Sequence, residues 1–210
     1  MSGIESLADV RPGDIGFGPL YGGWGSLAMW GEVVADGGFH VGELNVGHVY
    51  VVTQSYGTSV QVVEAMPHGA RSTLVGTERW GPKYAYCRPP EDYPGQALDA
   101  AAVAHAMIGI PYSPASYAAL AAWRFGVQTP KLEAWIDRRQ GTNRILLPSG
   151  LTATDLLPRE AICSVLADQA WTLTGKSMVG GVAHQCVTPS RLATSLLAMR
   201  GAVWGGPAFG

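Results

Sequence analysis

The chain has 210 residues, of which 47% are hydrophobic and 14% are charged, and its formal net charge is −2. This length allows one sizeable hydrophobic core and is marginal for two, so we expect a single domain over residues 1–210. No long run of one charge sign occurs, which argues against a nucleic-acid surface and against a polybasic membrane anchor.

The cysteines and the N-terminal residues bear on the compartment. Cys87, Cys163 and Cys186 cannot all pair within one chain, and their spacing fits no Cys-x-x-Cys metal pattern. We therefore expect a free thiol, no metal and no other cofactor. Neither a secretory signal peptide nor an apolar stretch of about 18 residues is present, so no transmembrane segment is expected. We expect a protein that is cytoplasmic as synthesised, which also fits a virion-associated protein or an enzyme released at lysis.

The first half of the chain indicates β-strands. The stretches "GHVYVVTQ" and "VQVVEAM" are rich in β-branched residues and flank the turn sequence "SYGTS". They predict a hairpin of residues 48–54 and 60–66. The sequence "RPGD" is a turn before the short apolar run "IGFG", and "KYAYCRP" predicts a further strand over residues 83–89.

The second half of the chain indicates helices. An Ala-rich segment after Pro94 predicts a helix that ends at Gly109. Three Ser-Pro or Thr-Pro pairs place a hydroxyl at the N-cap and proline at the first helical position. They predict helices over about 114–125, 130–140 and 189–200. A strand-rich half followed by a helical half predicts an α+β fold, with an antiparallel β-sheet packed against helices.

The stretch "EAICSVLADQAW" carries a cysteine in a predicted helix that we expect to begin at Pro158. A thiol near a helix N-terminus faces N–H groups and the positive end of the helix dipole, which favour the thiolate. The backbone N–H groups of Cys163 and Ser164 would form part of an oxyanion hole. A single cysteine on an apolar helix is nevertheless more often a core residue, so packing and chemistry both stay open.

A nucleophilic thiol also needs a base and a group that orients the base. His48 follows Gly47 at the start of a predicted strand, where the scaffold can fix an imidazole. Glu64 ends the partner strand, and a carboxylate on an apolar strand needs a partner or a path to solvent. If the hairpin register brings the two together, Glu64 can hold the ring of His48. His40 is a rival base, and His68, His105 and His184 are weaker candidates.

The ordered set "RPGDIGF", "GHVYVV", "VQVVEAMPHGA", "GIPYS", "AICSVLADQAW" and "TPSRL" resembles the circularly permuted NlpC-type papain-like hydrolases. That group includes the YiiX-like and the lecithin retinol acyltransferase-like proteins. The histidine precedes the cysteine, which is the reverse of the ordinary NlpC order. The resemblance runs from about Pro12 to Leu192 and implies a permuted papain-like fold.

The resemblance also implies roles for individual residues. It makes Cys163 the nucleophile, His48 the general base and Glu64 the polar third member. Asp14 and Tyr112 match motif positions that are structural or line the pocket. Tyr50 departs from the small residue that the family often has there, and residues 126–158 look like an insertion that caps the site or forms an interface.

Three functions follow as expectations. The first is a cysteine hydrolase that cleaves a peptide amide of peptidoglycan, in a phage or lysis context. The second function keeps the cysteine chemistry but hydrolyses lipid acyl amides or transfers acyl groups. An apolar cleft formed by Trp24, Met29 and Trp30 would favour it. The third is a non-catalytic structural or binding subunit that assembles into a larger particle.

Overall fold

The computed structural model describes residues 3–19, 40–41, 44–113, 145–146, 152–153, 160–180 and 187–207. The described strands are β1 (Ile15–Gly18), β2 (His40–Val41), β3 (Leu44–Asn45), β4 (His48–Ser55), β5 (Val60–Met66), β6 (Gly69–Val75), β7 (Ala85–Arg88), β8 (Ile145–Leu146), β9 (Thr152–Ala153) and β10 (Val203–Gly205). The described α-helices are α2 (Gln96–Ala106), α5 (Cys163–Thr172) and α6 (Pro189–Ala198), and short 3-10 helices span Leu7–Asp9 and Thr77–Arg79.

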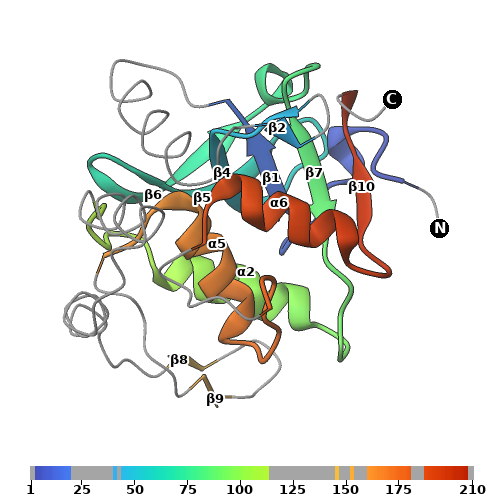
Figure 1. The fold of residues 1–210 in the computed structure, drawn as a ribbon. Helices are drawn as coiled ribbons and strands as arrows, with labels where there is room; N and C mark the ends of the chain where they lie inside the picture. Colours follow the sequence, from blue (N-terminus) through green and yellow to red (C-terminus); the bar gives the residue numbers. More distant parts are fainter. Residues whose placement is uncertain are drawn as a thin grey trace, which may run out of the picture.

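A six-stranded sheet in the order β10-β7-β1-β4-β5-β6 is the centre of the fold. All of its strand pairs are antiparallel. The helices α2, α5 and α6 lie beside this sheet (Figure 1). The expected α+β class with an antiparallel sheet packed against helices is therefore confirmed. Strands β2 with β3 and β8 with β9 form two separate two-stranded sheets.

The predicted hairpin is confirmed as β4 and β5. Its register pairs Val51 with Val63 and Val52 with Val62, and a bulge follows Val52. The strand expected over residues 83–89 is observed as the shorter β7. Strand β6 was not predicted from the sequence, although "GARSTLV" pairs with β5 over its whole length. Its alternation is weak because polar residues occupy the middle of the strand.

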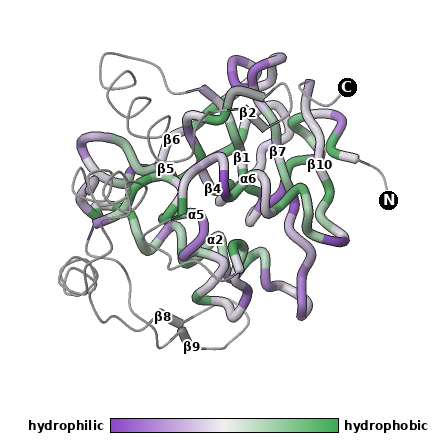
Figure 2. Tube along the Cα trace, in the orientation of Figure 1, coloured by the Kyte–Doolittle hydropathy of each residue, from purple (hydrophilic) through white to green (hydrophobic). Residues whose placement is uncertain are grey.

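The two faces of the sheet carry separate hydrophobic clusters. The first cluster joins strand residues such as Val49, Val51 and Val63 to buried residues of α2, α5 and α6. The second cluster lies on the other face, where Tyr50 and Val52 pack against residues of the N-terminal segment. Hydrophobic residues accordingly follow the central strands and the adjoining parts of α2 and α5 (Figure 2). The ends of the described chain also meet, because Ile4 forms a β-bridge with Gly205.

The helix predictions are confirmed in part. The Ala-rich helix is α2, and α6 begins after Thr188, whose Oγ1 accepts a hydrogen bond from the N–H of Arg191. The expected start of the third helix at Pro158 is wrong. Ala161 is bridged to Tyr112 in extended backbone, so the helix starts at Cys163. The helices expected over 114–125 and 130–140, and most of the predicted insertion 126–158, lie outside the described residues.

Among the described helices, none combines the length and apolar character needed to cross a bilayer.

Candidate functional site

His48 and Glu64 form a buried pair at the start of β4 and the end of β5. Nε2 of His48 lies 3.0 Å from Oε2 of Glu64. His48 is 5% exposed and Glu64 is 0% exposed. The antiparallel pairing of the two strands brings the beginning of one beside the end of the other, which is the arrangement that the hairpin predicted.

Glu64 accepts further hydrogen bonds on both of its oxygens. Oε1 accepts from Nε and Nη2 of Arg71, at 3.2 and 3.0 Å, and from Oγ1 of Thr73 at 3.1 Å. Oε2 accepts from Nη1 of Arg79 at 2.9 Å, in addition to His48. Burial alone would raise the pKa of Glu64, but His48 and Arg79 hold that pKa well below its ordinary value.

The ionised carboxylate fixes the tautomer of His48. A carboxylate can only accept a hydrogen bond, so Nε2 of the imidazole carries the proton that points to Glu64. In the neutral ring the lone pair then lies on Nδ1. That nitrogen is buried and makes no hydrogen bond to any described residue. A buried nitrogen acceptor without a partner is uncommon in folded proteins and marks a candidate general base.

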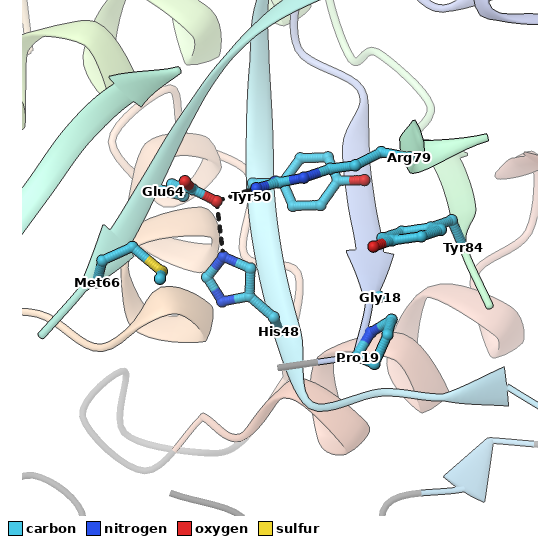
Figure 3. Close-up of a pocket in the computed structure, with 8 residues that line it drawn as sticks. All are labelled: Gly18, Pro19, His48, Tyr50, Glu64, Met66, Arg79 and Tyr84. Atoms are coloured by element: carbon cyan, nitrogen blue, oxygen red, sulfur yellow. Dashed lines mark hydrogen bonds and ion pairs between the residues drawn. The ribbon is translucent and has the colours of Figure 1, made fainter. Parts of the chain in front are cut away.

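A cavity of about 100 Å³ adjoins the pair (Figure 3). It is lined by Gly18, Pro19, His48, Tyr50, Glu64, Met66, Arg79 and Tyr84. Gly18 is paired with His48 across β1 and β4. Tyr50, the departure from the family pattern, does contribute to the cavity wall. Its ring fits because residue 16 is glycine, where a Cβ atom would lie 2.0 Å from the ring of Tyr50.

Cys163 is the first residue of α5, the helix that packs against β4 and β5. It forms no disulfide, is 1% exposed, and packs within the first cluster. It does not belong to the cavity lining, which contains Tyr50 of the second cluster. The thiol therefore lies on one face of the sheet and the cavity on the other. A substrate can contact both only by passing around the end of the sheet.

The start of α5 is anchored at the end of the sheet that carries His48. The turn between β5 and β6 lies at this end, where Met66 pairs with Gly69. Ala70 then exchanges two backbone hydrogen bonds with residues 109–110, of 2.7 and 2.8 Å. Tyr112 continues this segment and forms a bridge with Ala161. Cys163 follows two residues later, so the connection from the turn to the helix is short.

The other predicted site residues have mainly structural contacts. Oγ of Ser164 is buried and donates to the carbonyl of Val187 at 2.7 Å, which ties α5 to the segment before α6. Tyr112 is half-buried and packs against the first cluster. The carboxylate of Asp14 accepts from Nε and Nη2 of Arg88, at 2.9 and 2.8 Å. Trp24 lies outside the described residues.

None of the other described histidines and cysteines lines the cavity beside this pair. His105 is exposed on α2, and His68 is exposed in the turn between β5 and β6. Cys87 is buried in β7, and burial raises the pKa of its thiol. His40 opens β2, whereas His184 and Cys186 lie outside the described residues.

Sequence reasoning missed Arg71, Thr73 and Arg79, the three further partners of Glu64. A buried glutamate needs compensating donors, which was a signal to search for basic residues nearby. Arg71 could have been found only with β6 assigned, because it lies opposite Glu64 in that pairing. Among the described residues, no three His, Cys, Asp or Glu side chains group together closely enough to share a metal ion.

The sequence matches no protein-family model and shows no significant match to a curated protein. The resemblance to the permuted NlpC-type hydrolases therefore stays a prediction from its motifs.

Proposed function

We propose that the protein is a cysteine-dependent amide hydrolase with the permuted papain-like fold. Cys163 is the nucleophile, His48 the general base and Glu64 the residue that orients the base. One observation carries the proposal. The imidazole of His48 is held by Glu64 through Nε2, while its buried Nδ1 makes no hydrogen bond to the described residues.

The proposed reaction passes through a thioester. Nδ1 of His48 takes the thiol proton as the sulfur of Cys163 attacks the substrate carbonyl carbon. Backbone N–H groups in the first turn of α5 stabilise the resulting oxyanion, because such groups have no acceptor inside the helix. The C–N bond then breaks, and His48 returns the proton to the leaving amine. Water, activated by the same nitrogen, hydrolyses the thioester and regenerates the thiol.

A peptide amide, with peptidoglycan as the first candidate, is the substrate class that we favour. The cavity is lined in part by the hydrogen-bonding side chains of His48, Arg79 and Tyr84. These side chains can hydrogen-bond the amide and carboxyl groups of a peptide, which a hydrocarbon chain lacks. This lining therefore supports the peptide over the lipid acyl amide.

The thiol chemistry is tested by alkylation with iodoacetamide at graded pH, read for each cysteine by peptide mass. We expect Cys163 to react in the wild type at neutral pH and to react at least about tenfold more slowly in His48→Ala, because the base is lost. His105→Ala is the matched control, since this histidine is exposed on α2. Cys87, whose pKa is raised by burial, should stay unlabelled in all three proteins.

Equal and slow labelling of Cys163 in the wild type and in His48→Ala would refute the activated thiol and favour the binding subunit. The substrate is tested with the same proteins and with Cys163→Ala. Purified peptidoglycan and fatty-acyl amides are incubated separately, and the released amines are measured. We expect release from peptidoglycan by the wild type and by His105→Ala, and none by His48→Ala or Cys163→Ala.

A further inference from the structure

Two guanidinium groups meet one buried carboxylate beside the cavity. Arg71 and Arg79 both bind Glu64, at 3.0 and 2.9 Å. Two guanidinium groups against one carboxylate leave one excess positive charge. Arg71 is directed to solvent, with its side chain 53% exposed, whereas Arg79 is 18% exposed and lines the cavity. The excess positive charge therefore borders the cavity through Arg79.

The guanidinium of Arg79 is held in place and still has donors to offer. Its Cζ lies 4.9 Å from the centroid of the Tyr50 ring, and Nη1 is bonded to Glu64. Neither Nε nor Nη2 donates to a described residue. In Figure 3 the guanidinium overlies the ring of Tyr50 and lies next to Glu64, with the ring of Tyr84 nearby. The group is fixed by stacking and by one ion pair, so its remaining N–H groups have a defined direction.

The neighbouring acidic residue does not cancel this charge inside the cavity. Glu78 is exposed, and its Oε1 accepts a hydrogen bond from the N–H of Gly76 at 2.7 Å. Among the described residues that line the cavity, Glu64 is the sole carboxylate, and it is already shared by His48, Arg71 and Arg79. An anionic group that enters the cavity would therefore meet a cation with unused donors.

We propose that this cavity binds a carboxylate group of the substrate through Arg79. A guanidinium is suited to a carboxylate, because its N–H groups can bind both oxygens at once. One excess charge offsets one carboxylate, whereas a phosphate dianion would remain under-compensated. A cavity of about 100 Å³ holds a carboxylate on a short stem, and Pro19 and Met66 offer it apolar walls.

The carboxylate site says what the substrate of the proposed hydrolase carries, and that part rests on the proposed function. Because Arg79 and His48 share Oε2 of Glu64, a carboxylate bound by Arg79 would lie beside the proposed general base. The substrate is then an amide with a free carboxylate near the scissile carbonyl. The binding of a small carboxylate to the cavity, by contrast, requires no turnover.

The test uses acetate as the probe, with acetamide as its neutral counterpart and inorganic phosphate as a second anion. The full chain, labelled with ¹⁵N at histidine, is titrated at constant ionic strength, and the imidazole resonances of His48 are followed by NMR. We expect acetate to shift these resonances saturably and acetamide to leave them unchanged. Phosphate should bind more weakly than acetate.

Arg79→Gln and Arg71→Gln are a matched pair, because both remove one ion pair with Glu64 and only the first removes a cavity residue. We expect acetate to bind at least about tenfold more weakly to Arg79→Gln, as for the loss of one charged hydrogen-bonding partner. In Arg71→Gln the affinity for acetate should fall by less than about threefold. Arg79→Lys keeps the charge without the planar guanidinium, so its affinity for acetate should lie between those of the wild type and Arg79→Gln. This variant is the control in case Arg79→Gln does not fold.

Equal responses to acetate and acetamide in the wild type would overturn the proposal, as would equal losses in Arg71→Gln and Arg79→Gln. The result is separable from the proposed function. If acetate binds as expected but His48→Ala alkylates like the wild type, the anion site stands and the hydrolase is refuted. If alkylation depends on His48 but acetate does not bind, the hydrolase stands and its carboxylate specificity is refuted.

Discussion

Glu64 is the residue on which most of the polar contacts of the candidate site converge. Its two oxygens accept five hydrogen bonds from four side chains. Removing one member of such a buried group leaves the others without compensation, which costs more than the group contributes as a whole. The same residue should therefore govern both the orientation of His48 and the response of the fold to acid.

Glu64→Gln should be less stable than the wild type by about 3 kcal/mol near neutral pH. The pKa of Glu64 is lowered in the folded state, below the ordinary value of 4.5. Its contribution is thus complete above pH 4.5 and is lost as the pH falls towards the folded pKa. The difference between the two proteins should shrink over that acid range, as measured by urea unfolding at a series of pH values. Glu5→Gln, an exposed position, is the control, and a difference independent of pH would contradict the prediction.

At the scale of elements, the turn before β1 fixes how α2 and α5 lie against the sheet. Gly13 has a φ of +89°, and a Cβ atom there would lie 2.5 Å from the carbonyl oxygen of Ala97 in α2. The carbonyl of Gly13 accepts a hydrogen bond of 3.1 Å from Nε1 of Trp171 in α5. The Gly-Asp turn that the sequence singled out is therefore a packing point for two helices.

Gly13→Ala should lower the free energy of unfolding by about 3 kcal/mol, the sum of a strained positive φ and of overpacking against a helix backbone. Gly57→Ala is the matched control, because Gly57 has a φ of +81° with no atom within 4 Å of the added Cβ. It should cost about 1 kcal/mol from the backbone alone. Thermal and urea unfolding of both variants measure the difference, and equal costs would show that the contact with Ala97 relaxes freely.

At the scale of the whole molecule, one sheet separates two hydrophobic clusters. Strands β4, β5, β6 and β7 contribute residues to both, because successive side chains of a strand point to opposite faces. Neither cluster can lose its packing without disturbing strands that the other cluster needs. The described part of the chain is thus expected to behave as one cooperative unit.

Unfolding in urea should therefore give coincident transitions by far-UV circular dichroism and by tryptophan fluorescence. Trp171 reports on the first cluster, and Trp80 packs against the second. Two separated transitions would contradict the expectation of a single domain over residues 1–210.

The candidate site was predictable where it depends on local pattern. The hairpin of β4 and β5 follows from β-branched runs around a turn, and the pairing of strand ends then brings His48 to Glu64. The cysteine at the start of a helix was also visible, although the helix begins at Cys163 rather than at Pro158. The bridge between Ala161 and Tyr112 decides that start, and such a contact leaves no trace in the local sequence.

By itself the sequence determined the α+β class, the central hairpin and the residue types of the candidate site, because hydrophobic alternation and turn residues act over short distances. Only the tertiary structure decided that Arg71 and Arg79 share Glu64, that Tyr50 and Arg79 border one cavity, and that α5 begins at the end of the sheet near His48. These contacts depend on the pairing of β5 with β6 and on the bonds that fix residues 109–113 to Ala70 and Ala161. Such long-range pairings are set by the packing of the whole chain, which no short stretch of sequence encodes.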